Sequence, residues 1–172
     1  MPSSMTNRHL RRIVLGIGNP ERGDDAAGRA VVRLLRGTLP DDVELVEQDG
    51  EATAVLAHIE GAAAAFIVDA CTSGVPAGTV QCFDVGAGPL PQASFGLSTH
   101  GFGLSEAIEL TRALGQLPPC CVVYAIEGSS FDVGAPLSPL VAAAVAAVAE
   151  QMRVEIAGNT GPRAEAACMK LH

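Results

Sequence analysis

The sequence predicts an α/β fold: a twisted, mostly parallel five-stranded sheet between helices, in three layers. Short apolar segments rich in β-branched residues alternate with segments of helical periodicity along most of the chain. Some of these segments, such as "AAAAFIVDA" at 62–70, are apolar throughout, which is typical of parallel strands covered on both faces. The 172 residues suit a single domain. We expect its core at about 12–153 and a loosely held tail at 154–172, where Gly, Asn and Pro accumulate.

Each element has its own local signal. We expect strands, in chain order, at residues 12–17, 42–49, 62–70, 77–85 and 120–128. Helices are expected from a cap at Asp24 or Gly23 to about Leu35, at 51–61, at 104–114, and from Pro139 to about Met152. Gly37 is placed to end the first helix, and Ser138 with Pro139 forms a typical N-cap and first position for the last one.

Composition excludes several classes of function. The net charge of −8 makes nucleic acid a poor partner, because phosphate binding needs clustered Lys and Arg. The longest apolar tract, near residue 140, is shorter than the ~20 residues that cross a bilayer. The five cysteines are odd in number, include no CxxC pair and follow no secretory leader, so we expect free thiols. These features predict a cytoplasmic protein that binds no membrane, and a monomer is favoured.

Acidic residues and one histidine follow the predicted strands. In open α/β sheets, ligands bind outside the carboxyl ends of the strands, so the residues that follow each strand are candidates for a site. Each of the five strands is followed by at least one such side chain: Asp24 and Asp25, Asp49, Asp69, His100 and Glu127. We therefore expect these groups to converge on one edge of the sheet.

A cluster of carboxylates would be relieved of its mutual repulsion by a divalent cation. Two carboxylates and an imidazole suit first-row metals, and three protein ligands leave positions open for water or substrate. Nickel, zinc, iron and manganese all fit these residue types. Such a metal can activate water for hydrolysis.

Each acidic residue also has a structural interpretation. Asp24 is expected to be a helix N-cap rather than a ligand, and Asp25 can equally favour the helix dipole. A turn explains Asp49 about as well as a catalytic role does, and Asp69 can cap a turn, although a carboxylate after a buried strand favours function. Glu127 is interpreted as structural. His100 lies among Ser, Thr and Gly, which favours a site over the core.

Four segments, in order along the chain, resemble motifs of the hydrogenase maturation endopeptidases. "GIGNPERGDDAAG" at 16–28 is similar to the first-loop motif of that family, and "FIVDA" at 66–70 to its third-strand aspartate segment. "STHGFGL" at 98–104 resembles its histidine segment, and "LSPLV" at 137–141 the start of its last helix. Together these matches span most of residues 12–152.

The resemblance implies a specific activity. Members of this family remove a C-terminal extension from the precursor of the large subunit of nickel–iron hydrogenase, once nickel has been inserted. By position, the metal-contacting residues are Asp25, Asp69 and His100, and nickel arrives with the precursor. The catalytic set is then these three, with Asp49 or a ligand carboxylate as base. The sequence departs from the family at "DGEATAVL", where Glu51 adds an acid that can alter substrate fit.

Other classes stay open at this point. "GIGNP" also occurs in peptidyl-tRNA hydrolases, but their catalytic histidine and asparagine are replaced here by "ERGDDAAG". A Rossmann-like dinucleotide module needs a third Gly where Glu21 stands, although Asp49 fits a ribose contact. A module that binds the hydrogenase precursor without cutting it would contain the same three ligands.

Overall fold

The computed structural model describes residues 11–92 and 103–158, and its sheet confirms the predicted α/β class. Five strands lie in the order β2-β1-β3-β5-β4. They are β1 (Arg12–Ile17), β2 (Val43–Gln48), β3 (Ala64–Cys71), β4 (Val80–Asp84) and β5 (Cys120–Glu127). The strands β2, β1, β3 and β5 pair in parallel, so their carboxyl ends lie at one edge of the sheet.

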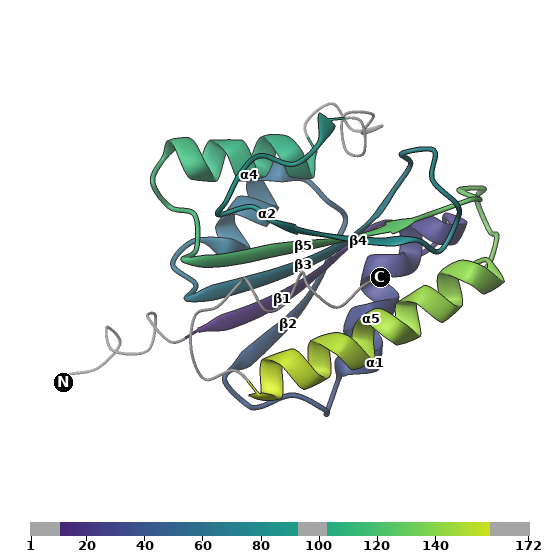
Figure 1. Ribbon diagram of the computed structural model, residues 1–172, viewed down its shortest axis with the longest axis horizontal. Coiled ribbons are helices and arrows are strands. Elements are labelled where there is room, and N and C mark those ends of the chain that lie inside the picture. The colour runs from purple at the N-terminus through teal and green to yellow at the C-terminus, as the bar shows by residue number, and fades with distance from the viewer. Residues whose placement is uncertain (1–10, 93–102, 159–172) are drawn as a thin grey trace.

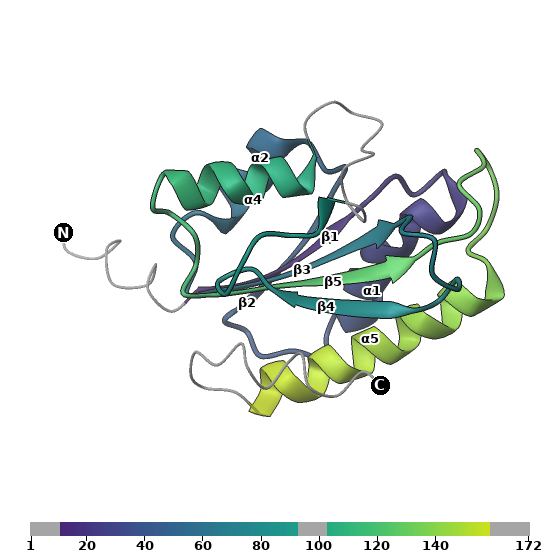
Figure 2. The ribbon, with the colours of Figure 1, turned by 45° about the horizontal axis from the view of Figure 1, so that its top comes forward.

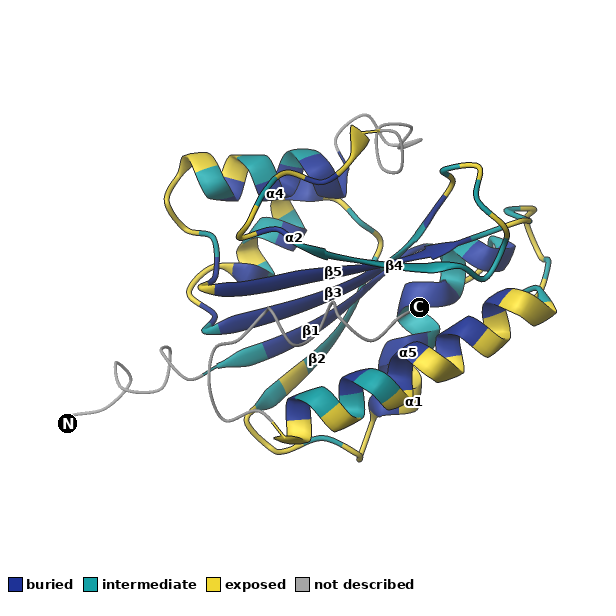
Figure 3. Cartoon of the chain, viewed as in Figure 1, coloured by how far each residue is buried: buried dark blue, intermediate teal, exposed yellow. Residues whose placement is uncertain are grey.

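Helices cover both faces of this sheet (Figure 1). On one face lie α1 (Ala27–Leu35) and α5 (Pro139–Gly158), and on the other lie α2 (Ala52–Ile59) and α4 (Leu104–Ala113). Successive residues of a strand point to opposite faces. Accordingly, Val14 and Val122 pack with α1 and α5, while Ile13 and Val123 pack with α2 and α4. The central strands are buried on both sides (Figure 3), as the continuous apolar segments indicate.

The prediction that every strand ends at the same edge was wrong for β4. This strand pairs antiparallel with β5, with Val80 opposite Ile126 and Asp84 opposite Val122. A parallel strand needs a crossover of about a dozen residues or more, and the connection at 72–79 is too short. The chain therefore turns back at the carboxyl edge of β3, and Asp84 ends β4 at the opposite edge.

The placement of two acidic residues and one helix boundary also differ from the prediction. Asp69 and Glu127 do not follow their strands but lie within β3 and β5, inside the predicted ranges 62–70 and 120–128, because these two strands stay paired up to Cys71 and Glu127. The last helix continues through Gly158, well past Met152, so residues 154–158 do not belong to a loose tail. Ile156 is buried there, and its carbonyl accepts a hydrogen bond from the Arg12 guanidinium.

Glycines let β1, α1 and β3 approach each other closely. A Cβ on Gly28, within α1, would overlap the carbonyl oxygens of Val68 and Ile17. A Cβ on Gly16 would overlap the carbonyl oxygen of Gly28 in turn. This contact seats the first helix directly against the carboxyl ends of two strands.

Gly28→Ala should therefore lower the free energy of unfolding by about 1–3 kcal/mol or more, since backbone must move to admit the methyl group. Urea unfolding followed by circular dichroism measures the change. Gly88→Ala is the matched control, because a Cβ there meets no atom within 4 Å. Equal stability of the two variants would contradict the close approach.

Candidate functional site

The connections that follow β1, β3 and β5 all lie at the carboxyl edge of the sheet (Figure 2). The first runs from Gly18 through a 3-10 helix at Gly23–Ala26 into α1. The second joins β3 to β4, and the third joins β5 to α5. Segments far apart in the sequence thus surround the same end of β3.

Asp25 is held by the fold of the first loop. Its carboxylate accepts a hydrogen bond from the Asn19 backbone N–H at 3.0 Å, and its own N–H donates to the Arg22 carbonyl at 3.1 Å. Gly18 has a φ of 139°, and a Cβ there would overlap the Asp25 carbonyl oxygen. The loop therefore folds back on itself, and the half-buried Asp25 side chain is fixed beside the end of β1.

Asp69 lies at the centre of the sheet edge. Its strand runs between β1 and β5, with Asp69 opposite Ala125 and the preceding Val68 opposite Gly16. Burial, followed by the charge of Asp25, raises the pKa of Asp69 to about 7, and a hydrogen bond from the Ala70 backbone opposes this only in part. The 3-10 helix that carries Asp25 packs against β3, so the two carboxylates repel each other.

Among the described residues, no cationic side chain balances the charge of this pair. No ion pair among residues 11–92 and 103–158 involves Asp25 or Asp69. Two adjacent carboxylates form a donor set that suits a divalent cation, and burial raises the pKa of one of them, Asp69. In the described part of the chain, no group of three His, Cys, Asp or Glu side chains gathers at a metal-binding distance.

The predicted third ligand, His100, lies outside the described residues. The structure resumes at Gly103, the N-cap of α4, whose N–H donates to the Glu106 carboxylate at 3.0 Å. The last residues of α4 are connected to the amino end of β5. The first residues of α4 therefore lie away from the amino edge of the sheet.

Asp49 follows β2 and is exposed. Its carboxylate accepts a hydrogen bond from the Glu51 N–H at 3.0 Å, which is the turn geometry that the sequence allows. Glu51 in turn is the N-cap of α2 and accepts from the N–H groups of Thr53 and Ala54. The extra acid at this point thus has a local structural role.

Asp24 is not a helix N-cap, contrary to the prediction. Its side chain is fully buried and accepts hydrogen bonds from the backbone N–H groups of Ser129, Ser130 and Ser138 at 2.7–3.0 Å. The hydroxyls of Ser129 and Ser138 also donate to it. Burial alone would raise the pKa of Asp24, but these hydrogen bonds lower it. Asp24 therefore fastens the β5–α5 connection to the first loop.

Glu127 does the same for the β3–β4 connection, which confirms its structural interpretation. It is 2% exposed and accepts from the N–H groups of Ser73 and Gly74 and from the Ser73 hydroxyl. These two anchoring roles were not predicted from the sequence. The one available signal was the presence of serine-rich segments, "EGSS" and "TSGV", with many hydroxyl and backbone donors.

The described cysteines are free, as predicted, and do not form a nucleophilic site. Burial, and then the Glu127 carboxylate, raise the pKa of the Cys71 thiol far above its usual range. Burial also raises the pKa of Cys121 to about 12. Since the thiolate is the nucleophile, neither residue is suited to cysteine-type catalysis.

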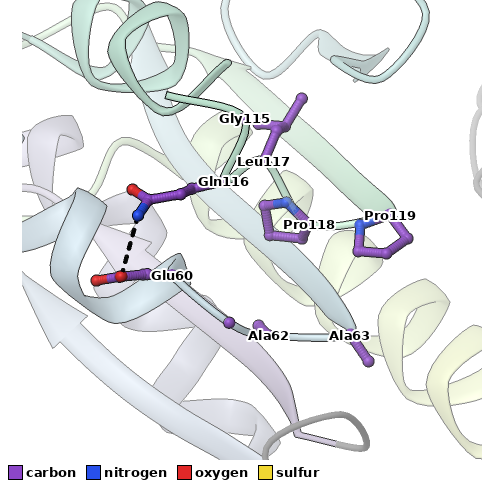
Figure 4. Close-up of a pocket in the computed structure, with 9 residues that line it drawn as sticks. Glu60, Ala62, Ala63, Gly115, Gln116, Leu117, Pro118 and Pro119 are labelled. Atoms are coloured by element: carbon purple, nitrogen blue, oxygen red, sulfur yellow. Dashed lines mark hydrogen bonds between the residues drawn. The ribbon is translucent and has the colours of Figure 1, made fainter. Parts of the chain in front are cut away.

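A hollow of about 370 Å³ lies at the other end of the sheet, away from the acidic pair. The α2–β3 and α4–β5 connections line it, and Gln116 donates a hydrogen bond to Glu60 across it at 3.2 Å (Figure 4). Its lining includes Leu117, Pro118 and Pro119 and lacks a cluster of catalytic groups. The carboxyl edge is therefore the better candidate site.

Comparison with known proteins identifies the family. Residues 29–155 match the model of the hydrogenase maturation protease family. The chain belongs to the hydrogenase maturation protease family. It is accordingly a peptidase, and this assignment favours a protease over the peptidyl-tRNA hydrolase and dinucleotide-binding alternatives. The match begins after the first loop, so Asp25 precedes it while Asp69 lies within it.

Solved structures of this protease family share the fold. The hydrogenase maturating endopeptidase HybD from E. coli is 27% identical with a TM-score of 0.69, over 83% of this chain and 90% of that one. The [NiFe] hydrogenase maturation protease HycI from Thermococcus kodakarensis is 25% identical with a TM-score of 0.65, over 87% and 94%. An endopeptidase from Escherichia coli, at 24% identity, has a TM-score of 0.75 over 87% and 94%. A comparison with curated protein sequences gives no significant match.

No helix within 11–92 or 103–158 is long and apolar enough to cross a membrane.

Proposed function

We propose that this protease removes the C-terminal extension of a nickel–iron hydrogenase large-subunit precursor after nickel insertion. The observation that carries the proposal is the Asp25–Asp69 pair at the carboxyl edge of β1 and β3. In the proposed complex, nickel held by the precursor contacts Asp25, Asp69 and His100. The substrate metal thereby supplies the positive charge that the pair lacks.

This arrangement links nickel insertion to cleavage. Without the cation, burial and then the charge of Asp25 raise the pKa of Asp69 to about 7, so a large share of this carboxyl group is protonated at neutral pH. A precursor that carries nickel gains attraction to the carboxylates, whereas an empty precursor does not. Recognition of the metal then aligns the scissile bond with the site, and correct alignment contributes a large part of a catalysed rate.

Hydrolysis requires a base that accepts a proton from the attacking water. We assign this role to Asp49, which stands just past β2, next to the end of β1. The turn bond to Glu51 orients its carboxylate, and its exposure gives water access. A carboxylate of the ligand pair is the second candidate. Bound nickel can polarise the scissile carbonyl.

The test is intact-mass spectrometry of the cognate precursor after incubation with the protease, with and without nickel loaded. We expect a C-terminal peptide to be lost from the nickel-loaded precursor alone. Equal cleavage of both forms would refute recognition through nickel. No cleavage of the loaded form, with binding retained, would instead identify a non-cutting binder.

Asp49→Asn should lower kcat by about 100-fold, in the range that general-base catalysis contributes. The amide oxygen can still accept from the Glu51 N–H, so the turn is kept and only the proton acceptor is lost. Single-turnover cleavage of the loaded precursor measures the effect. An unchanged rate would transfer the role to the ligand pair.

A further inference from the structure

We infer that Arg22 binds a carboxylate of the precursor close to the scissile bond and so selects the substrate of this protease. The inference rests on the proposed function, because it places a substrate group beside the Asp25–Asp69 pair. It adds a residue that determines specificity and an acidic group of the substrate that this residue binds. Recognition of the metal requires neither.

Arg22 is part of the loop that holds Asp25. Its N–H donates to the Asn19 carbonyl at 3.3 Å, and its own carbonyl accepts from the Asp25 N–H at 3.1 Å. The next residue, Gly23, packs against the Ser130 carbonyl of the β5–α5 connection, where a Cβ would overlap it. Arg22 thus stands where two connections meet at the carboxyl edge.

The guanidinium of Arg22 lacks the partners that the other arginines have. Seven arginines within 11–92 and 103–158 make an ion pair: Arg11, Arg12, Arg29, Arg33, Arg36, Arg112 and Arg153. For the Arg22 side chain, the described residues provide neither an ion pair nor a hydrogen bond, and its Nε atom is buried without an acceptor. A buried donor on a charged group is costly to leave unpaired, and a ligand can satisfy it.

Arg22 carries a positive charge among acidic residues, so the ligand that it can bind at this edge is an anion. Asp25, Asp69, Asp49, Glu21 and Asp132 all lie on loops or strand ends at this edge. A substrate carboxylate would be repelled by most of them. Among the described residues, no ion pair joins Arg22 to Asp25 or Asp69, so the charge of Arg22 is not used to neutralise the pair. It remains available for an acidic substrate group, which a guanidinium can bind through two parallel hydrogen bonds.

The carboxylate has two sources in a precursor: an Asp or Glu side chain near the cut, or the terminal carboxylate of the extension. The experiment compares Arg22→Gln, Arg22→Lys and unmutated protease on nickel-loaded precursor. Arg153→Gln is the matched control, because it removes the same charge from an exposed, locally paired site on α5. Three precursors are used. The first is the natural precursor, the second has the acidic side chains around the cut changed to amides, and the third has an amidated C-terminus.

We expect Arg22→Gln to raise KM by about 10-fold or more with kcat little changed, as for the loss of a charged hydrogen bond. Arg22→Lys should recover part of the loss, because it keeps the charge without the planar fork. On the precursor that lacks the bound carboxylate, the unmutated protease and Arg22→Gln should have the same KM. The precursor that abolishes the difference identifies the source.

A KM for Arg22→Gln equal to that of the unmutated protease and of Arg153→Gln overturns the inference while the proposed function stands. A difference that persists on both altered precursors also overturns it, since the effect would then come from the loop. If the unmutated protease does not cut, its Kd for natural precursor is measured instead. Equal Kd values for the unmutated protease and Arg22→Gln overturn the inference, and so does the absence of binding. Weaker binding by Arg22→Gln that depends on the precursor carboxylate supports the inference.

Discussion

Asp69→Asn should abolish cleavage of the nickel-loaded precursor and at the same time make the free protease more stable at pH 8. Asn is nearly isosteric with Asp and can keep the hydrogen bond from Ala70, but it is a poor ligand for a cation. We expect a rate loss of at least about 100-fold, the size typical of losing a group that acts only in the productive complex. Loss of activity with a gain in stability excludes misfolding as the cause.

The sign of the stability change follows from the pKa. The pKa of Asp69 is near its ordinary value of 3.8 in the unfolded chain and is raised to about 7 in the folded protein. Between these values the folded state holds a proton that the unfolded state has released, so stability falls as pH rises through this window. Asp69→Asn does not titrate, and its advantage over the unmutated protease should grow by about 1–3 kcal/mol from pH 5 to pH 8.

Chemical unfolding in metal-free buffer at both pH values measures this difference. Asp41→Asn, at an exposed position before β2, is the matched control and should show no such growth. A stability difference between Asp69→Asn and the unmutated protease that is the same at pH 5 and pH 8 would contradict the burial and repulsion assigned to Asp69.

Asp24→Ala should be among the most destabilising single changes in the chain. It leaves three backbone N–H groups, those of Ser129, Ser130 and Ser138, without their acceptor in a buried place. Each buried, unsatisfied donor costs about 1–3 kcal/mol, so we expect a total loss of roughly 3–5 kcal/mol. For a chain of this size that lowers Tm by roughly 6–20 °C.

Asp24→Asn separates charge from shape, because its amide oxygen can accept some of these bonds and its NH₂ group cannot. It should fall between Asp24→Ala and the unmutated protease. The folded pKa of Asp24 is lowered, so its stabilisation is present above the unfolded pKa and is lost as pH falls through the folded one. The destabilisation by Asp24→Ala should therefore shrink in strong acid. An Asp24→Ala variant with unchanged Tm at pH 7 would refute the anchoring role.

The two aspartates in "GDDAAG" show why neighbouring identical residues have different roles. Their order in the sequence is compatible with a cap and a ligand, and the sequence predicts the cap for Asp24. In the fold, the first loop turns Asp24 inward onto donors more than a hundred residues away, while Asp25 faces the end of β3. Only long-range packing brings Ser129 and Ser138 to Asp24, so the helix N-cap predicted from local propensity was wrong.

The sequence by itself determined the fold class, the parallel core and the helices on both faces. These follow from local periodicity and from apolar runs, which depend on nearest neighbours along the chain. It also predicted that Asp25 and Asp69 lie near the ends of strands that share one edge, and the resemblance in four ordered segments led to the family. The roles of Asp25, Asp49, Asp69 and His100 stay predictions.

The tertiary structure alone decided the direction of β4, the anchoring by Asp24 and Glu127, and the isolation of Arg22. Strand direction depends on whether the connection at 72–79 can cross the sheet, which no periodicity within β4 records. Burial and hydrogen bonding of a carboxylate depend on segments distant in sequence, as with Glu127 and Ser73. An arginine without a partner is recognised only when the acids around it have been placed in space.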